Sequence, residues 1–282
     1  MKSMQDPIPG QIANVLSIAG SDPSGGAGIQ ADLKTFAACA TFGMAAITAL
    51  TAQNTRGVSA VMALEPSFVR AQIEAVFADI RVDAVKVGMI ANAGSATAIA
   101  DCLDAHPDIP VVLDPVMVAK GGASLLEAEA VGVLKTRLLA RATLVTPNLP
   151  EVAALLGDDE AVSRAAMGRQ AEALMAMGAR AVLVKGGHLP GPQCPDLFVE
   201  RSAAFWFEGQ RIETVNTHGT GCSLSSAIAA EIAKGQALRQ AVSSARIWLG
   251  GAIRTGGALS VGSGHGPIHH FHALWSRHAG HD

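Results

Sequence analysis

The sequence predicts an α/β protein with an open, mostly parallel central sheet and helices on both of its faces. Short apolar runs alternate with longer helical segments along most of the chain. Hydrophobic residues make up 49% of the 282 residues, whereas charged residues make up only 16%. Strands that are apolar throughout are typical of a sheet that is buried on both faces.

In the first half of the chain, apolar runs and helical segments follow each other in turn. The runs that predict strands are Asn14–Ala19, Met44–Thr51, Ala84–Val87 and Val111–Leu113. The segments that predict helices are Gly28–Ala40, Glu65–Ile80 and Ala93–Leu103. Pro66 stands near the start of the second helix, where its missing N–H group is tolerated.

The second half continues the alternation and then ends differently. Predicted helices are Leu125–Leu139, Leu149–Leu156 and Ala161–Met177, the last of them stopped by Gly178. Predicted strands are Ala142–Thr146 and Ala181–Lys185, followed by a hairpin region at Leu197–Val199 and Phe205–Phe207. The helices Cys222–Lys234 and Leu238–Ile253 close the chain with no strand between them, which favours an open sheet over a closed eight-fold barrel.

Composition and charge restrict the class of protein. We expect a single domain over residues 1–282, with residues 1–12 as a flexible N-terminal tail, because no linker or change in composition divides the chain. The net charge is only −3 and there is no basic block, which argues against binding to nucleic acid. The uncharged segment Thr35–Thr55 holds little Leu, Ile or Phe, so a buried helix and strand explain it better than a membrane span.

Cysteine spacing indicates the compartment. The chain has four cysteines, which are far apart in sequence and form no C-x-x-C pair: Cys39, Cys102, Cys194 and Cys222. This spacing argues against a zinc ribbon, a redox-active pair or a disulfide scaffold. It fits a protein of the reducing cytoplasm.

Polar and glycine-rich residues follow each predicted strand. They are Gly20–Gly28, Gln53 and Asn54, Gly88 and Met89, Asp114 and Pro115, Pro147 with Asn148 and Glu151, and Gly186 with Gly187 and His188. In an open parallel sheet, ligands bind beyond the carboxyl ends of the strands. The sequence therefore predicts a small-molecule site at this edge of the sheet.

Two common phosphate-binding motifs can be tested directly. No stretch matches the Walker pattern G-x-x-x-x-G-K-[ST]. Residues 26–31 match the dinucleotide pattern superficially, but no Asp or Glu occurs between Asp32 and Glu65 to bind a ribose. A nicotinamide cofactor is therefore not expected.

The segment Asn216–Ser223 (NTHGTGCS) carries the strongest single signal. Gly219, Thr220 and Gly221 open a predicted helix, whose first N–H groups and dipole favour an anion such as a phosphoryl group. Cys222 lies in the first turn, a position that lowers the pKa of a thiol, so that a thiolate could accept a substrate proton. A small buried cysteine behind a glycine cap is the plain structural alternative.

Other residues at the same edge suit a phosphate group, Mg²⁺ and an aromatic ligand. Lys185 could neutralise phosphate, and Asp114 and Glu151 could hold Mg²⁺ through water. Gln53 offers a donor and an acceptor to the edge of an aminopyrimidine, and Met89 offers an apolar wall. The alternative for Lys185 is a solvated lysine at a strand end. For the other four residues it is a structural role in a cap, a turn or the core.

A cluster of histidines near the C-terminus also needs an interpretation. The segment from His265 to His272 contains four histidines, but their spacing fits no zinc pattern and no cysteine is close in sequence. We expect a surface tail there.

Taken together, the motifs resemble those of bacterial hydroxymethylpyrimidine/phosphomethylpyrimidine kinases, a branch of the ribokinase-like superfamily. The resemblance extends from Ala19 to His272 and is thinner at 193–207. Sugar kinases of the superfamily typically carry G-A-G-D, with Asp in the place of Cys222. The matching stretches are AGSDPSGGAGIQADLKTF, ITALTAQNT, KVGMIAN, LDPVMVAKGGA, TPNLPEV, VKGGH, NTHGTGCSLSSAIAA and GSGHGPIHHFH.

The resemblance implies an ATP- and Mg²⁺-dependent enzyme of thiamine biosynthesis that phosphorylates a hydroxymethylpyrimidine and then its monophosphate, and it suggests a homodimer. Gln53 would bind the ring, and Gly20, Ala27, Asp32, Met89 and Val116 would line its pocket. Cys222 would be the base beside an anion hole of Gly219, Thr220 and Gly221. The residues that would bind the nucleotide are Asp114, Asn148, Glu151 and Lys185. Asp114 and Glu151 would also hold the Mg²⁺ ion through water.

Two alternatives remain open at this point. Related enzymes accept vitamin B6 alcohols, so a pyridoxal or pyridoxine kinase is the nearest alternative. A non-catalytic ligand-binding or regulatory protein on the same fold is the other. The intact Gly-Thr-Gly-Cys segment at 219–222 argues against the second.

Overall fold

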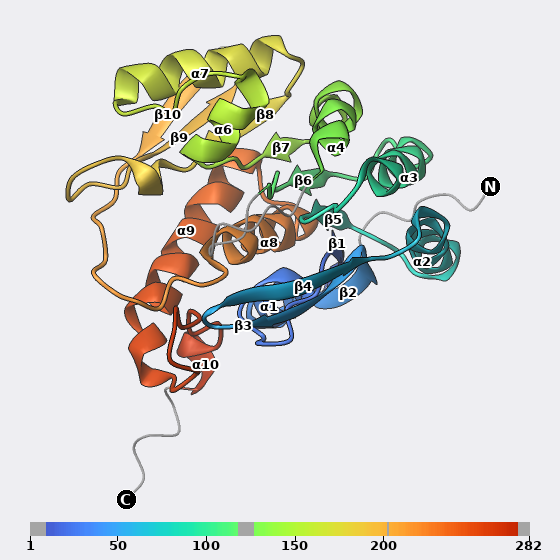
Figure 1. Ribbon diagram of the computed structural model, residues 1–282, viewed down its shortest axis with the longest axis horizontal. Coiled ribbons are helices and arrows are strands. Elements are labelled where there is room, and N and C mark those ends of the chain that lie inside the picture. The colour runs from blue at the N-terminus through green and yellow to red at the C-terminus, as the bar shows by residue number, and fades with distance from the viewer. Residues whose placement is uncertain (1–9, 118–126, 202, 276–282) are drawn as a thin grey trace, which may run out of the picture.

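The main sheet is open and mostly parallel, as predicted (Figure 1). The computed structural model describes residues 10–117, 127–201 and 203–275. The strand order is β10-β9-β8-β7-β6-β5-β1-β2, and β9 and β10 are antiparallel to their neighbours. Its strands are β1 (Asn14–Ala19), β2 (Phe42–Ile47), β5 (Ala84–Val87), β6 (Val111–Leu113), β7 (Leu144–Val145), β8 (Ala181–Val184), β9 (Asp196–Glu200) and β10 (Ala203–Phe207).

Helices cover both faces of this sheet, because successive strand residues face opposite sides. Leu16 and Ile18 of β1 belong to one apolar core, whereas Val15, which precedes them, belongs to another. The first core is formed with α2 (Pro66–Asp79), α3 (Ala93–Asp104), α4 (Ala128–Val133), a π-helical turn at Leu134–Leu138, α5 (Leu139–Arg141), α6 (Leu149–Leu156) and α7 (Arg164–Ala176). The second is formed with α1 (Gly28–Ala38), α8 (Thr220–Ala233) and α9 (Leu238–Arg254).

The single strand predicted at Met44–Thr51 is wrong. The chain leaves the main sheet after Ile47 and forms β3 (Ala49–Asn54), which pairs only with the unpredicted strand β4 (Gly57–Ala63) in a two-stranded sheet. Thr48 fixes the break, since its N–H donates to Ala19 O (3.0 Å) and its Oγ1 to Met89 O (2.6 Å). Gln53 and Asn54 therefore lie within a hairpin strand and do not follow a strand of the main sheet.

Other boundaries differ by a few residues. The helix predicted from Ala161 begins at Arg164, because Ser163 caps its N-terminus by accepting a bond from Ala166 N. The strand predicted at Ala142–Thr146 shortens to β7, and the helix predicted to end at Leu139 continues to Arg141. The start predicted for that helix, Leu125, lies outside the described residues, as do residues 1–9 of the predicted tail.

The C-terminal segment is not the surface tail that we predicted. His269 and His270 are buried, and His270 Nε2 lies 3.0 Å from Ser223 Oγ in α8. The segment ends in the short helix α10 (His272–Trp275). Within the described ranges, no group of three or more His, Cys, Asp and Glu residues is arranged to hold a metal ion, and no helix is long and apolar enough to cross a membrane.

Candidate active site

The site lies where the strand order of the main sheet reverses. β1 is hydrogen-bonded to β2 on one side and to β5 on the other, and the chain continues from β5 to β8 in the second direction. Open α/β sheets bind ligands beyond the carboxyl ends of their strands at such a point. The loops that follow β1, β5, β6 and β8 carry Gly20, Met89, Asp114 and Lys185, as the sequence predicted.

The glycine-rich loop after β1 is organised by Asp22. The buried carboxylate accepts bonds from Ser24 N (2.9 Å), Ser24 Oγ (2.7 Å), Gly26 N (3.2 Å) and Ala27 N (2.8 Å). Gly28 has a φ of +56°, and a Cβ atom there would lie 2.4 Å from Gly20 O. Only glycine fits at Gly28, and the folded loop places Gly20 and Ala27 beside the site.

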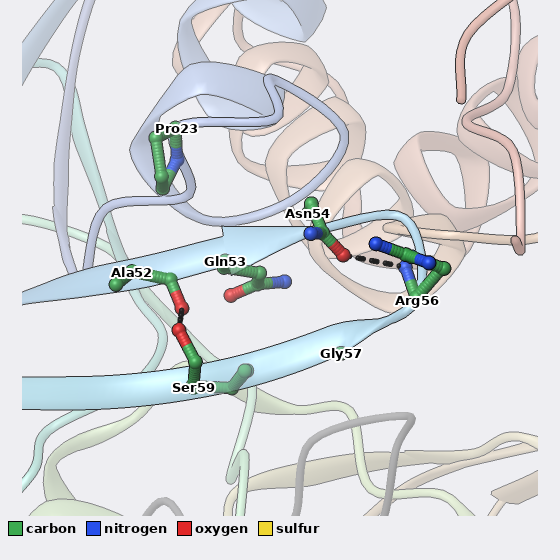
Figure 2. A pocket seen from close by; sticks show the side chains of 8 residues that line it. Pro23, Ala52, Gln53, Asn54, Arg56, Gly57 and Ser59 are labelled. Carbon is green, nitrogen blue, oxygen red and sulfur yellow. Dashed lines mark hydrogen bonds between the residues drawn. The ribbon is translucent and has the colours of Figure 1, made fainter. Parts of the chain in front are cut away.

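One side of the candidate site is formed by this loop, Met89 and the hairpin. We call it the acceptor side, because the resemblance implies that the molecule to be phosphorylated binds there. A Cβ atom on Gly20 would lie 2.7 Å from Met89 Sδ, so the two residues touch. Figure 2 shows Gln53 on β3, with Pro23 of the glycine-rich loop on one side of the strand and β4 on the other. An open hollow of about 600 Å³ lies here, lined by Pro23, Ala52, Gln53, Asn54, Arg56, Gly57, Val58 and Ser59.

The start of α8 joins the acceptor side to a cluster of charges. Gly219 caps the helix with a φ of +76°, and a Cβ atom there would lie 1.8 Å from Gly26 O. A Cβ atom on Gly221 would lie 3.4 Å from Lys185 Nζ and 3.7 Å from Asp114 Oδ2. The helix N-terminus, which favours anions, thus lies between the glycine-rich loop and the lysine.

The charge cluster consists of Asp114, Glu151 and Lys185. Lys185 Nζ lies 2.9 Å from Asp114 Oδ1 and 3.7 Å from Glu151 Oε2. Burial raises the pKa of Asp114, but the ammonium groups of Lys185 and Lys86 outweigh it, and the net pKa is lowered. Asn148 and Glu151 also form a capping box at the start of α6, so both residues have the structural role that we considered as the alternative.

These carboxylates suit a hydrated magnesium ion. Mg²⁺ prefers oxygen ligands and usually keeps several waters, with one or two carboxylates and substrate phosphates completing its shell. Asp114 and Glu151 offer two carboxylates beside the anion-binding helix start. Asp114 Oδ1 already accepts bonds from Lys185 and Thr146, which favours contact with the ion through water.

The stability of the protein relative to Glu151→Gln should fall by about 1–3 kcal/mol as the pH rises from about 4.5 to about 7. Burial raises the pKa of Glu151 from its usual 4.5 to about 7, although Lys185 opposes the shift. In this window the folded protein keeps a proton that the unfolded chain releases, so a rise in pH favours unfolding. Urea unfolding of both proteins across this range measures the difference, and a constant difference would contradict the prediction.

The prediction of a lowered thiol pKa at Cys222 is wrong. Burial raises the pKa of the Cys222 thiol to about 11. The Lys86 ammonium and the hydrogen bond from the Gly28 backbone favour the thiolate, whereas Asp32 and Asp114 oppose it. The first helical turn does supply a favourable field, but the densely packed surroundings remove the water that would stabilise a thiolate.

Asp32 does not line the pocket as the resemblance implied. Its carboxylate is fully buried and accepts bonds from Lys86 Nζ (2.8 and 3.0 Å), and from two serines, Ser17 Oγ (2.6 Å) and Ser226 Oγ (2.7 Å). It thereby ties α1 to β1, β5 and α8 beneath the site. Val116, another residue proposed for the pocket, is half-buried beyond Asp114, and the chain is described only as far as Met117 before the next gap.

Sequence reasoning missed three polar residues of the site: Asp22, Lys86 and His218. His218 Nε2 lies 2.8 Å from Asp22 Oδ2, which links α8 to the glycine-rich loop. Lys86 could have been found, because a lysine inside the apolar run Ala84–Val87 must be paired if the strand is buried. His218 and Asp22 gave no such signal, since they are far apart in sequence.

The fold and the site define a ribokinase-like kinase, an enzyme that transfers a phosphoryl group to a small molecule. The chain belongs to the phosphomethylpyrimidine kinase family, whose profile matches residues 22–269.

Named relatives agree with this assignment. The chain is 50% identical to a hydroxymethylpyrimidine/phosphomethylpyrimidine kinase of Salmonella typhimurium over 94% of this chain and 100% of the relative. It is 49% identical to a thiamine biosynthesis bifunctional protein of Geobacter sulfurreducens, over 91% of this chain and 52% of that protein. A solved structure of Staphylococcus aureus pyridoxal kinase with AMP-PCP and pyridoxal superposes with a TM-score of 0.86, at 32% identity, over 94% of this chain and 96% of that one.

Proposed function

We propose that this enzyme uses ATP and Mg²⁺ to phosphorylate 4-amino-5-hydroxymethyl-2-methylpyrimidine, and then phosphorylates the monophosphate to the diphosphate. The observation that carries the proposal is the meeting of three groups at one sheet edge: the start of α8, the Lys185–Asp114–Glu151 cluster and the hairpin with Gln53. The first two suit a phosphoryl group, and the third suits the edge of an aminopyrimidine. The family and its relatives of thiamine biosynthesis support the same reaction.

Phosphoryl transfer needs positioning and charge stabilisation more than covalent chemistry. Lys185 would neutralise the phosphates from one side, and the N–H groups of Thr220 and Gly221 would bind the transferred group from the other. Asp114 and Glu151 would hold hydrated Mg²⁺, which would neutralise charge on the nucleotide. Asn148 orients Glu151 through the capping box and so takes part indirectly.

The acceptor alcohol would approach from the hairpin side. Gln53 would bind the ring, and Gly20, Ala27 and Met89 would pack around it. In its thiolate form, Cys222 would take the proton of the attacking hydroxyl group, whose oxygen forms the new bond to the phosphorus while the nucleoside diphosphate leaves.

The direct test is mass spectrometry of the products formed from ATP, Mg²⁺ and the hydroxymethylpyrimidine. We expect a monophosphate first and a diphosphate later. Monophosphate alone would contradict the second step. If the pyrimidine gives no product but pyridoxine is phosphorylated, the proposed substrate is wrong and the enzyme is a vitamin B6 kinase.

Replacing Gln53 by Ala should weaken pyrimidine binding by about 10-fold or more while leaving ATP binding within about 3-fold, because the amide faces the acceptor side alone. Separate KM values for the two substrates measure this difference. The matched control is Gln72→Ala, which removes an amide that bonds Ile47 away from the hollow. Equal weakening of both substrates by Gln53→Ala would assign Gln53 a structural role.

We also propose that the enzyme is a homodimer that acts in the reducing cytoplasm. The four cysteines are free thiols, which suits that compartment. The β3–β4 hairpin exposes Leu50, Val61 and Met62, with Met62 66% exposed, and a two-stranded sheet alone is marginal in water. A second copy that covers this face would stabilise it.

Replacing Met62 by Lys should raise the dissociation constant of the dimer by at least about 10-fold, because the lysine would be buried in the interface without a partner. Light scattering across a dilution series measures the change. Phe68→Lys, another exposed apolar position but on α2, is the control. A wild-type protein that is monomeric at high concentration would overturn the proposal.

A further inference from the structure

His218 lies where three segments that are far apart in sequence meet. Its Nε2 is 2.8 Å from Asp22 Oδ2 and 3.3 Å from Gln53 Nε2. Its backbone N–H donates to Gly266 O (3.0 Å) in the C-terminal segment. The side chain is buried, and a Cβ atom on Gly26 would lie 2.3 Å from its ring. The ring is therefore held in one position.

The proton on His218 Nε2 can be assigned from Asp22. Burial raises the pKa of Asp22, but hydrogen bonds from His218 and Ser24 outweigh it and lower the pKa to about 2. Asp22 is thus a carboxylate at neutral pH, and a carboxylate only accepts hydrogen bonds. Because Asp22 Oδ2 lies 2.8 Å from His218 Nε2, that nitrogen must carry the proton and donate it.

This proton fixes which end of the Gln53 amide faces His218. An N–H donor on Nε2 cannot accept a bond from the NH₂ group of Gln53. Its single proton is donated to Asp22 Oδ2, the closer partner at 2.8 Å, and can be shared with the amide oxygen of Gln53 only as the weaker branch of a bifurcated bond. The oxygen and nitrogen of a glutamine amide are assigned from the surrounding bonds. His218 therefore requires Gln53 Oε1 on its side.

The other end of the amide gives the same answer independently. Thr51 Oγ1 lies 3.3 Å from Gln53 Oε1 and 2.9 Å from Ser21 O. The hydroxyl has one proton, which goes to the closer acceptor, Ser21 O. The hydroxyl can then only accept from Gln53. Thr51 therefore requires the NH₂ group of Gln53 on its side, in agreement with His218.

We propose that His218 is a positioning residue for substrate specificity, which locks the Gln53 amide with its oxygen toward His218 and its nitrogen toward Thr51. One amide N–H and one oxygen lone pair then remain for a ligand. This pair complements a ring nitrogen that accepts, beside an exocyclic amine that donates. The inference rests on the proposed function, in which Gln53 binds an aminopyrimidine. A ring that carries a hydroxyl group, and lacks an amine beside a ring nitrogen, would match the free N–H and the free oxygen of Gln53 less well.

The ligand-free orientation can be measured without any substrate. Neutron diffraction from deuterium-exchanged crystals distinguishes the nitrogen of Gln53 from its oxygen. We expect deuterium on His218 Nε2 and on the Gln53 nitrogen that faces Thr51. Deuterium on a Gln53 nitrogen that faces His218 would overturn the proposal, whatever the enzyme phosphorylates.

Kinetics then test the effect on specificity, as the ratio of kcat/KM for the aminopyrimidine alcohol to kcat/KM for pyridoxine. His218→Leu should lower this ratio by about 10–100-fold, because only the long Thr51 contact of 3.3 Å then opposes rotation of the amide to its other orientation. His218→Gln, whose amide can still donate toward Asp22 and Gln53, should keep the ratio within about 3-fold of the wild type. His270→Leu removes another buried histidine beside α8, away from Gln53, and should leave the ratio unchanged.

The Gln53→Ala background shows whether His218 acts through Gln53. There, His218→Leu should have no further effect on the ratio. An unchanged ratio in His218→Leu alone, or an undiminished effect in the Gln53→Ala background, would overturn the proposal. A wild-type enzyme that does not phosphorylate the pyrimidine would instead contradict the proposed function. The neutron result would still decide the orientation of the amide.

Discussion

Replacing Cys222 by Ala should lower kcat by about 10²–10⁴-fold, the range expected when a general base is removed. The thiol lies in the first turn of α8, between the glycine-rich loop and the Lys185 cluster, where the attacking hydroxyl group would lose its proton. Because burial raises the pKa of this thiol to about 11, activity should rise with pH through the neutral range. Initial rates at saturating substrates, measured across pH, test both points.

Cys222→Asp provides the matched comparison. A carboxylate is a base at lower pH than a thiolate, so this variant should keep measurable activity and lose most of the dependence on alkaline pH. Cys39→Ala removes a buried thiol at the C-terminal end of α1 and should leave kcat within about 2-fold. Unchanged kcat in Cys222→Ala would exclude the thiol as the base.

Replacing Lys86 by Met should destabilise the folded protein by about 3–5 kcal/mol, the cost of leaving one partner of a buried ion pair unpaired. Lys86 and Asp32 are both fully buried, and Asp32 would keep its charge or take up a proton beneath the site. Urea unfolding monitored by circular dichroism measures the loss. A loss of less than about 1 kcal/mol would contradict the argument.

The double variant Lys86→Met with Asp32→Asn separates the pair from the packing around it. Asn can still bond Ser17 and Ser226, so it removes the unpaired charge while it keeps both serine contacts. The double variant should therefore recover at least about half of the lost stability. If the two changes simply add, the loss in Lys86→Met comes from packing and not from the charge of Asp32.

The fold was predictable because apolar runs decide which segments are buried. β1, β5, β6 and β8 were found within one residue, since each is a mainly apolar run that is followed by a polar or glycine residue. The β3–β4 hairpin was missed because β4 is largely exposed and lacks the pattern of a buried strand. Its pairing depends on the turn at Thr48, which is set by contacts to Ala19 and Met89.

For the candidate site, the sequence was enough to predict which residues lie at the ends of strands. Lys185, Asp114 and Gly221 do converge, because parallel strands bring their carboxyl ends to one edge. The environment of each residue was not predictable. A rule about helix N-termini favoured a thiolate at Cys222, but the burial that opposes it is a property of the whole packed structure. Asp32 and the buried histidines were misplaced for the same reason, since their partners are remote in sequence.

The β3–β4 hairpin is not hydrogen-bonded into the main sheet, and this separation has an evolutionary consequence. Gln53, which we propose to bind the acceptor, lies in a two-stranded sheet that is separate from the eight-stranded main sheet. Substitutions or even small insertions in the hairpin can change the acceptor without shifting Lys185, Asp114 or the start of α8. Grafting this hairpin between related kinases is therefore a practical route to exchange their vitamin substrates while the phosphorylating machinery is kept.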